Sequence, residues 1–363
     1  PDIISLHREL TKIKKNKIDN VIIEASSHGL DQDRMCGLNF KAGIFTNLSR
    51  DHLDYHKTMK NYLNSKLILF SKLMKENQHL ISDSTISEFS ILKKIANKKK
   101  LKIIDINNLE FKNNNLIGLF QIKNLSMSIM AAKVCGLNLN KIKSILHKIQ
   151  CVDGRLECVR RLSNRSIIFV DYAHTPDALL TVLKALHTRY KRNITLIFGC
   201  GGERDKNKRP IMAKIAGKFC KKIYVTDDNP RRESAKKIRE AIIINLNNKN
   251  FIEIPSRINA IKDAIIKSEP YEIILVAGKG HEEQQVYSKK IINISDKKII
   301  KSVREKNISL KKINFLHNSN ILKNITKKKD NFFFKGVSIN SKNIKKKNLF
   351  IAIKGPNYDG HKY

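Results

Sequence analysis

The chain has 363 residues, enough for two or three domains of roughly 100 to 200 residues each, and carries a formal net charge of +38. That charge is spread along the whole chain beside abundant isoleucine and asparagine, which favours a compositional bias over a nucleic-acid-binding surface. The six cysteines show neither CxxC nor zinc-ligand spacing, and apolar runs are far shorter than the roughly 20 residues of a membrane span, so we expect a cytoplasmic protein with reduced thiols.

The first predicted elements are a helix and a strand. Apolar residues three and four apart over Ile3–Ile13 predict the helix, and the run Val21–Ile23 predicts a strand of a parallel sheet. A chain that opens in this way indicates a βαβ unit whose first strand precedes residue 1, so we interpret it as a section of a longer protein. Glu24 would stand at the carboxyl edge of the sheet, where α/β proteins bind ligands, although a salt bridge there is as plausible.

The loop 45–56 contains the densest group of reactive side chains. The run 42–45 predicts the end of a short buried strand, and the spacing over 58–74 predicts a helix with Lys66 inside its apolar stripe. Such a lysine either extends its amine to water or is buried. Burial lowers the pKa of a lysine, and a neutral amine can take up carbon dioxide as a carbamate. His52 and a carbamylated Lys66 would suit a divalent cation with oxygen ligands.

Other segments of the first half are less informative. Gln32 and Arg34 follow on a polar segment, where Arg34 could clamp a carboxylate or phosphate, or could simply be solvated. Residues 76–116 have weak periodicity and predict no function. Helices are predicted at 124–134 and 139–149, and most of their apolar positions are core.

A domain junction is predicted at 151–157, because strands and helices alternate regularly after it. Four apolar runs, each followed by a loop rich in Gly, Asp, Arg or His, predict parallel strands at 167–170, 194–198, 223–226 and 273–277. Thr175 and Pro176 are typical of a helix start. This pattern predicts a doubly wound α/β sheet with one functional edge. Asp228 and Arg231 could recognise a zwitterionic amino acid, or they could form a pair that pins a turn.

Five polar motifs follow one another along the chain. They are E-A-S-S-H-G at 24–29, T-N-L-S-R-D-H-L-D-Y-H at 46–56, D-Y-A-H-T-P-D at 171–177, D-N-P-R at 228–231 and G-K-G-H-E at 278–282. Together they resemble the ATP-dependent Mur ligases of peptidoglycan synthesis, over about residues 1–300. The resemblance implies a central, P-loop-type three-layer ATPase domain at 1–150, incomplete at its start, and a C-terminal Rossmann-like domain at 151–305.

The resemblance also implies a reaction and its partners. ATP would phosphorylate the D-glutamate γ-carboxylate of UDP-MurNAc-L-Ala-D-Glu, and an amine of meso-diaminopimelate would attack the acyl phosphate, with Mg²⁺ as the metal. We expect a monomer with these small-molecule partners, no specific nucleic acid and no membrane span. The phosphate-binding loop GxxxxGK[ST] does not occur in the chain and would precede residue 1, so this chain alone is expected to bind ATP poorly or not at all.

Position by position, the resemblance implies roles for individual residues. Contacts to the UDP-MurNAc-dipeptide would come from Ser26, Gln32 and Arg34. Catalysis and Mg²⁺ binding would rest on Glu24, His52 and Lys66. ATP would be surrounded by Asn124, Arg155, Asp171 and His174, with Gln121 standing where relatives usually have asparagine. Diaminopimelate would be bound by Arg204, Asp228, Asn229, Pro230, Arg231, Gly278 and Glu282. Lysine-adding relatives carry other residues in place of Arg231.

The end of the chain resembles a different part of the family. V-S-I-N-S-K at 337–342, L-F-I-A-I-K-G at 349–355 and D-G-H at 359–361 are similar to the opening of a D-alanyl-D-alanine-adding Mur ligase. Residues 306–363 would then be a linker and the beginning of a further small α/β domain, and the parent would be a fused bifunctional ligase.

Two other classes of function remain open from the residues. A basic nucleic-acid-binding protein would show an affinity that falls steeply with salt. A metal-dependent hydrolase built on His52, Asp54 and His56 would need no ATP.

Overall fold

The computed structural model describes residues 2–107, 109, 111, 113, 115–246 and 250–305, together with two short strands near the C-terminus. The chain divides into two compact units, Pro1–Arg304 and Glu305–Tyr363. In the second unit, β12 (Gly336–Ser338) pairs in parallel with β13 (Asn348–Phe350), and the rest of the motifs at 337–361 lie outside the described residues. No helix in the described part of the chain is long and apolar enough to cross a membrane.

The first half of unit 1 contains a three-stranded parallel sheet in the order β1-β2-β3. Its strands are β1 (Ala42–Ile44), β2 (His79–Ser82) and β3 (Lys102–Asp105). Its helices are α1 (Ile3–Lys15), α2 (Ser27–Asp31), α3 (Leu53–His56), α4 (Met59–Ile68), α5 (Phe89–Lys99), α6 (Leu119–Val134) and α7 (Leu139–Ile145). A π-helical turn at Leu69–Leu73 continues α4, and a 3₁₀ turn at Leu146–Lys148 continues α7.

The apolar spacing of α4 places one side of the helix in the core. Phe70 and Met74, which follow α4, are buried in one cluster with Phe45 and Leu80. Thr58 begins the helix, because its hydroxyl accepts a hydrogen bond from the backbone N–H of Asn61. The core therefore fixes α4, and with it Lys66, against the strand that precedes the loop 45–56.

The strand predicted at 21–23 is not present, and this prediction is wrong. Ile22 is 98% exposed and Val21 is 45% exposed. β1 is the edge strand of the described three-stranded sheet and pairs with β2, so the segment 21–24 has no ladder partner among the described strands. An apolar run forms a strand only where its backbone groups are paired with a neighbour. Glu24 therefore lies in an exposed loop before α2 instead of at a sheet edge.

The second half of unit 1 contains a six-stranded sheet in the order β4-β5-β9-β6-β7-β8. Its strands are β4 (Glu157–Arg161), β5 (Ile167–Asp171), β6 (Ile194–Phe198), β7 (Lys222–Val225), β8 (Phe251–Glu253) and β9 (Ile273–Ala277). β4 is antiparallel to β5, and the other neighbours are parallel. The predicted doubly wound α/β sheet is confirmed. A hairpin of β10 (Gln284–Tyr287) and β11 (Lys290–Asn293) follows β9.

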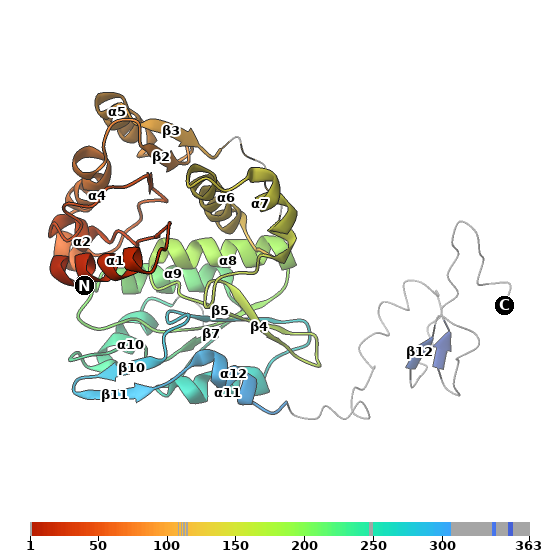
Figure 1. Ribbon diagram of the computed structural model, residues 1–363. Coiled ribbons are helices and arrows are strands. Elements are labelled where there is room, and N and C mark those ends of the chain that lie inside the picture. The colour runs from red at the N-terminus through yellow and green to blue at the C-terminus, as the bar shows by residue number, and fades with distance from the viewer. Residues whose placement is uncertain are drawn as a thin grey trace. The chain divides into compact units, whose positions relative to one another are not determined.

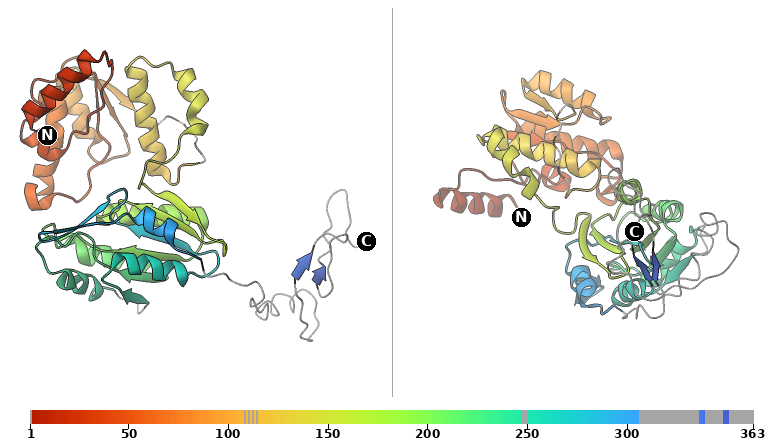
Figure 2. Two further views of the ribbon diagram at one scale, coloured as in Figure 1. Left: turned by 60° about the horizontal axis from the view of Figure 1, so that its bottom comes forward. Right: turned by 90° about the vertical axis from the view of Figure 1, so that its right-hand side faces the viewer.

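Helices cover both faces of the six-stranded sheet. One apolar cluster contains side chains of α8 (Pro176–Tyr190), α9 (Lys208–Phe219) and α10 (Ala235–Ile243). These three helices are labelled in Figure 1. A second cluster contains side chains of α11 (Arg257–Ile266) and α12 (Asp296–Ser302), which lie in front of the sheet in the left view of Figure 2. Sheets covered in this way have strands that are buried throughout, as β5, β6 and β9 are. The loops after β5, β6, β7 and β9 consequently share one edge.

Candidate functional site

The shared edge of the six-stranded sheet carries most of the predicted nucleotide- and amino-acid-binding residues. Asp171 is the last residue of β5, and the loop after β5 holds His174. The loop after β6 holds Arg204, that after β7 holds residues 228–231, and that after β9 holds Gly278 and Glu282. Gly278 joins three of these loops. Its N–H donates to the Asp171 carbonyl at 3.1 Å, its φ is +110°, and a Cβ there would lie 2.7 Å from Asp228 Oδ2. Only glycine allows the loops to approach so closely.

Asn229 and Glu282 are held around a fully buried lysine, Lys279. The Lys279 Nζ donates to Asn229 Oδ1 and to Glu282 Oε2, each at 3.2 Å, and to the Gln284 carbonyl. Asn229 Nδ2 donates to the same Glu282 oxygen at 3.2 Å. Burial alone would raise the pKa of Glu282, but Lys279, Tyr172 and Asn229 together lower it, which favours the ionised carboxylate.

Asp228 and Arg231 occupy different positions in the loop after β7. Asp228 is buried; its Oδ1 accepts from the N–H of Asn229 at 2.7 Å, and its Oδ2 has no hydrogen-bond partner among the described residues. Arg231 has a φ of +54°, and its Nη1 donates to the Gly202 carbonyl at 2.8 Å. The backbone N–H of Arg231 donates a hydrogen bond to the Val286 carbonyl, and its carbonyl accepts one from the N–H of Ser288 in the hairpin.

The remaining residues of the predicted amino-acid group are Pro230 and Arg204. Pro230 is buried, and its carbonyl accepts from the N–H of Glu233 at 3.1 Å. Arg204 is exposed, and its Nη1 donates to the Glu203 carbonyl at 3.1 Å. The buried members of this group thus lie in the loops after β7 and β9, and an arginine on the neighbouring loop stays accessible.

Three of the four predicted ATP-binding residues, Arg155, Asp171 and His174, lie in or near the segment 151–157. Asp171 is buried at the end of β5 and accepts from the N–H groups of Leu156 and Ala173 at 2.6 and 2.7 Å. Burial raises the pKa of Asp171 to about 6. The Arg155 guanidinium lies 4.4 Å from the ring centroid of Tyr172, and its Nη1 is buried without a hydrogen-bond partner in the described part of the chain.

Gln121 and Asn124 lie on α6 in contrasting surroundings. Asn124 is exposed, and no described contact joins its side chain to the other predicted ATP-binding residues. Gln121 is buried; its Oε1 accepts from the N–H of Ile117 at 2.9 Å and its Nε2 donates to the Arg155 carbonyl at 2.7 Å. The Gln121 amide therefore connects α6 to the junction that carries Arg155.

The loop 45–56 reaches the second half of unit 1 through Asp51. Its Oδ2 lies 3.6 Å from His52 Nε2 and 3.4 Å from His174 Nε2. Burial would raise the pKa of Asp51, but His174 and His52 lower it well below its ordinary value. Burial lowers the pKa of His52, and Asp51 offsets part of that effect. Sequence reasoning did not single out Asp51, and its only signal was its place beside His52 in the motif.

Lys66 extends from α4 toward the same loop. Its Nζ donates to the Asn47 carbonyl at 2.6 Å and lies 5.1 and 5.4 Å from the ring centroids of Phe45 and Tyr62. Burial lowers the pKa of Lys66. The two aromatic rings thus lie beside the amine of this lysine.

Comparisons with known proteins agree with this arrangement. The profile of the Mur ligase middle domain matches residues 1–126, and that of the Mur ligase glutamate ligase domain matches residues 154–280. The chain is 38% identical over 326 residues to the UDP-N-acetylmuramoyl-L-alanyl-D-glutamate–2,6-diaminopimelate ligase of Rickettsia bellii (strain RML369-C), covering 82% of this chain and 68% of that protein. The chain belongs to the Mur ligase family.

Two further likenesses support the assignment at different levels. The ligase of the same name from Buchnera aphidicola subsp. Acyrthosiphon pisum (strain APS) is 38% identical over 330 residues, covering 82% of this Mur ligase and 66% of that protein. This Mur ligase thus spans about two thirds of the length of such relatives. A Mycobacterium tuberculosis folylpolyglutamate synthase, solved with ADP and AMPPCP, has a TM-score of 0.53 at 13% identity over 66% of this chain and 61% of that one, which shows the fold alone.

The predicted magnesium ligands of this Mur ligase do not form a metal site in their unmodified state. Lys66 carries an ammonium that donates to a carbonyl, and Glu24 is exposed. Across the described ranges, no three His, Cys, Asp or Glu residues are grouped so that they could hold a metal ion. An ammonium repels a divalent cation, so Glu24, His52 and Lys66 would fit one only after chemical change at the lysine. Their role as ligands stays a prediction.

The predicted dipeptide-binding residues of this Mur ligase lie around α2. Ser26 begins this helix, since its Oγ accepts from the N–H of Gly29 at 3.1 Å. Gln32 and Arg34 are brought together, because Arg34 Nη2 donates to Gln32 Oε1. Gln32 Nε2 in turn donates to the Tyr55 hydroxyl at 3.1 Å. Gln32 and Arg34 therefore lie beside the loop 45–56, whereas no described contact of the Ser26 side chain reaches that loop.

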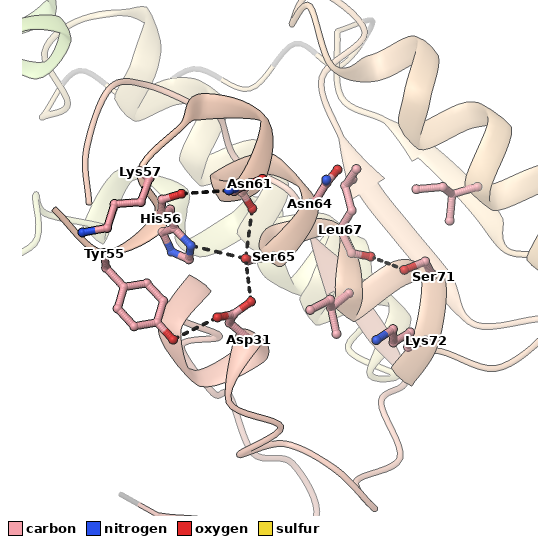
Figure 3. A pocket seen from close by; sticks show the side chains of 12 residues that line it. Asp31, Tyr55, His56, Lys57, Asn61, Asn64, Ser65, Leu67, Ser71 and Lys72 are labelled. Carbon is pink, nitrogen blue, oxygen red and sulfur yellow. Dashed lines mark hydrogen bonds between the residues drawn. The ribbon is translucent and has the colours of Figure 1, made fainter. Parts of the chain in front are cut away.

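A cavity of about 650 Å³ lies between α4 and the end of α2 (Figure 3). On its wall, Asp31 accepts from the Tyr55 hydroxyl at 2.9 Å and from Ser65 Oγ at 3.1 Å. His56 is buried between two serines, with Nε2 2.9 Å from Ser27 Oγ and Nδ1 3.4 Å from Ser65 Oγ. Both nitrogens of His56 thus lie against hydroxyl groups of the protein.

Ion pairs join the loop 45–56 of this Mur ligase to the loop after β6. Arg50 Nε lies 2.7 Å from Asp205 Oδ2, and the neighbouring Arg204 Nη1 lies 3.8 Å from Asp54 Oδ2. The backbone N–H of Arg50 also donates to Asp177 Oδ2 at 3.3 Å. The loop that contains His52 and the loop that contains Arg204 are therefore connected within unit 1.

Proposed function

We propose that this Mur ligase forms an amide bond between UDP-MurNAc-L-Ala-D-Glu and meso-diaminopimelate, with ATP providing the leaving group. The observation that carries the proposal is the set of contacts between the loop 45–56 and the loops after β5 and β6, through Asp51 with His174 and Arg50 with Asp205. Bond formation between two substrates requires that both be held in one place. In this proposal residues 1–150 and 151–305 are the two catalytic domains, with a hinge near 150–156.

The charges of the loops after β6, β7 and β9 support a diamino acid as the incoming substrate. Asp228 Oδ2 is buried without a partner in the described structure, and a substrate ammonium would supply the missing donor. Glu282 is held as a carboxylate by Lys279. Arg204 is exposed and could bind a substrate carboxylate. The family resemblance implies that Arg231 is the residue that selects diaminopimelate over lysine.

Groups at the domain junction support a phosphate-bearing co-substrate. The buried Nη1 of Arg155 has no partner among the described residues, and a phosphate oxygen is the acceptor that a guanidinium binds best. His174 lies nearby, with its Nδ1 2.8 Å from the Tyr172 carbonyl and its Nε2 near Asp51. Magnesium, when bound with ATP, would neutralise phosphate charge.

The reaction in this proposal has two steps. A γ-carboxylate oxygen attacks the terminal phosphorus of ATP, and ADP leaves. The amine then attacks the acyl carbon, inorganic phosphate leaves, and the amine loses a proton. The chain's own residues would orient the amine through Asp228 and Glu282 and balance negative charge through Arg155. Lys66, once carbamylated, would be a ligand of Mg²⁺.

An assay of ADP release tests the proposal. The natural full-length protein is incubated with ATP, Mg²⁺ and UDP-MurNAc-L-Ala-D-Glu, with meso-diaminopimelate, with lysine, or without an amino acid. We expect ADP release that depends on diaminopimelate and is at least about tenfold slower with lysine, since a site built for a charged group rejects an analogue that lacks it. Equal ADP release in the three reactions would refute the proposal.

A fusion to a second ligase is part of the same proposal. Its motifs at 337–361 lie mostly outside the described residues, and the matched family profiles cover 1–126 and 154–280. Parallel pairing of β12 with β13 is compatible with the start of a small α/β domain. Release of ADP that depends on D-alanyl-D-alanine and on the tripeptide product would support the fusion, and its absence in an otherwise active full-length protein would count against it.

A further inference from the structure

We propose that Lys279 is a positioning residue that presents Asn229 and Glu282 to the incoming amino acid. This inference rests on the proposed function and adds to it a residue outside the predicted amino-acid group. Lys279 is fully buried, and its ammonium donates to one side chain from the loop after β7, one from the loop after β9, and the Gln284 carbonyl.

The hydrogen bonds of Lys279 account for all the donors that an ammonium has. A lysine ammonium has three N–H donors, and Asn229 Oδ1, Glu282 Oε2 and the Gln284 carbonyl are three acceptors. A buried charge is tolerated when it is paired and hydrogen-bonded in this way. The lysine has no donor left for a substrate, so its effect on a substrate passes through the residues it holds.

Lys279 fixes the direction of the Asn229 amide. Asn229 Oδ1 accepts from Lys279 and also from the N–H of Val286 at 3.0 Å. With its oxygen turned toward these donors, the amide must point its Nδ2 group at Glu282. Without the ammonium, one of the two interactions that define this orientation is lost.

Lys279 also sets the charge and direction of Glu282. The carboxylate receives hydrogen bonds from Lys279 and Asn229 on Oε2 and from the Tyr172 hydroxyl on Oε1 at 3.1 Å. Glu282 is only half-buried, so it remains accessible from one side. Loss of the lysine would leave this carboxylate without its cationic partner and free to reorient or to take up a proton.

The test compares Lys279→Met with Lys221→Met in the natural full-length protein. Methionine keeps an unbranched apolar stem and removes the charge, and Lys221 is an exposed lysine whose ion pair with Glu269 lies on the same domain. We expect Lys279→Met to raise the KM for diaminopimelate about 10- to 100-fold, typical for loss of a group that orients a binding residue. The KM for ATP should change less than about threefold, and Lys221→Met should change neither constant.

A double variant separates positioning from general support of the fold. Lys279 acts partly through Glu282, so Lys279→Met added to Glu282→Gln should raise the KM for diaminopimelate by clearly less than the product of the two single effects. Should Lys279→Met fail to fold, Lys279→Arg, which keeps the charge in a different shape, is assayed in its place with the same expected split between the two KM values. An equal rise in both KM values, or fully additive effects in the double variant, would overturn the inference. Failure of the proposed function looks different, because the unsubstituted protein would then show no diaminopimelate-dependent ADP release.

Discussion

Lys279 and Lys66 of this Mur ligase differ in how far they are removed from water and in how many acceptors they have. Lys279 is fully buried and is satisfied by three acceptors within its own domain. Lys66 is half-buried between Phe45 and Tyr62 and has the Asn47 carbonyl as its hydrogen-bond acceptor. Burial therefore lowers the pKa of Lys66, which favours the neutral amine that carbamylation needs. Of these two lysines, Lys66 is therefore the better candidate for carbamylation.

Replacing Lys66 by alanine tests its place in the reaction. We expect Lys66→Ala to lower kcat on the order of 10² or more, because it removes the group whose carbamate would hold Mg²⁺ near the developing negative charge. Added bicarbonate should not restore activity, since alanine has no amine to carbamylate. The measurement is diaminopimelate-dependent ADP release, with the exposed Lys60→Ala on the same helix as control. Undiminished turnover of Lys66→Ala would remove this lysine from the mechanism.

The pKa of Asp171 leads to a prediction about stability and pH. The carboxyl has a pKa near 3.8 in an unfolded chain, and burial raises the folded value to about 6. Between these values the folded protein binds the proton more tightly, so the contribution of this group to the free energy of unfolding falls as pH rises. Above about pH 6 that contribution stays constant. The Asp171→Asn side chain cannot ionise, so it should contribute no pH dependence to the free energy of unfolding.

Urea unfolding at several pH values measures the difference between Asp171→Asn and the parent. The variant should be less stable by roughly 1–3 kcal/mol, because an amide N–H would face one of the backbone N–H groups of Leu156 and Ala173. The difference in stability between variant and parent should shrink as pH rises from about 4 to about 6, since only the parent loses the contribution of the Asp171 carboxyl there. A deficit that grows over this range would contradict the assigned pKa.

At the scale of the elements, the junction before β4 packs on the loop after β9 through a glycine. Gly154 has a φ of +65°, and a Cβ there would lie 2.3 Å from the backbone nitrogen of His281 and 2.4 Å from the Gly280 carbonyl carbon. Gly37 has a φ of +78°, but a Cβ there would meet only the His7 ring, at an ordinary 3.5 Å. The two glycines therefore share a backbone conformation and differ in the space around them.

This difference predicts unequal effects of alanine at the two positions. Left-handed backbone costs a residue with a Cβ about 1–2 kcal/mol, which applies to both. Gly154→Ala should lose a further 1–3 kcal/mol, roughly, because backbone atoms must move to admit the methyl group. Thermal unfolding should give a clearly lower midpoint for Gly154→Ala than for Gly37→Ala. Equal midpoints would mean that the junction and the loop after β9 are not packed as described.

The sequence predicts elements well where burial gives them a continuous apolar run. β5, β6, β7 and β9 are such strands, since helices cover both faces of the sheet. β4 and β8 are edge strands that are only partly buried, so they lack that signal, and β2, α5 and β3 fall in the lysine-rich segment 76–116. The segment 21–24 begins with an apolar run but has no partner strand among the described strands. Sequence periodicity cannot reveal the absence of a partner strand.

The candidate site is predictable to a similar degree. Its motifs are readable because reactive side chains gather in loops that follow strands, as in the loop 45–56 and the segment 228–231. Asp51, Gln121 and Lys279 each have one partner far away in sequence, namely His174, the Arg155 carbonyl and Asn229, and the sequence alone cannot reveal these tertiary contacts. A lysine between two glycines, as Lys279 is, gives no sequence signal that it will be fully buried.

At the scale of unit 1 as a whole, oppositely charged side chains face each other where the two halves meet, and each half contributes one cation and one anion. Arg50 faces Asp205, and Asp54 faces Arg204. Exposed ion pairs contribute only roughly 0–1 kcal/mol each, so they stabilise the fold little. Their larger effect is on register, because like charges placed opposite each other repel and displace the loop 45–56 from the loop after β6.

Exchange of the Arg50 and Asp205 charges tests whether this register matters for turnover. Arg50→Glu and Asp205→Arg each place two like charges together, and we expect each to lower kcat/KM about tenfold, the equivalent of roughly 1.4 kcal/mol. The double variant restores opposite charges with the positions exchanged and should recover to within about threefold of the parent, because attraction between the two loops returns. Lys267→Glu, which disrupts an exposed ion pair with Asp263 inside one helix of the second half, should leave kcat/KM unchanged. A double variant no more active than either single variant would show that Arg50 and Asp205 act separately and do not align the two halves.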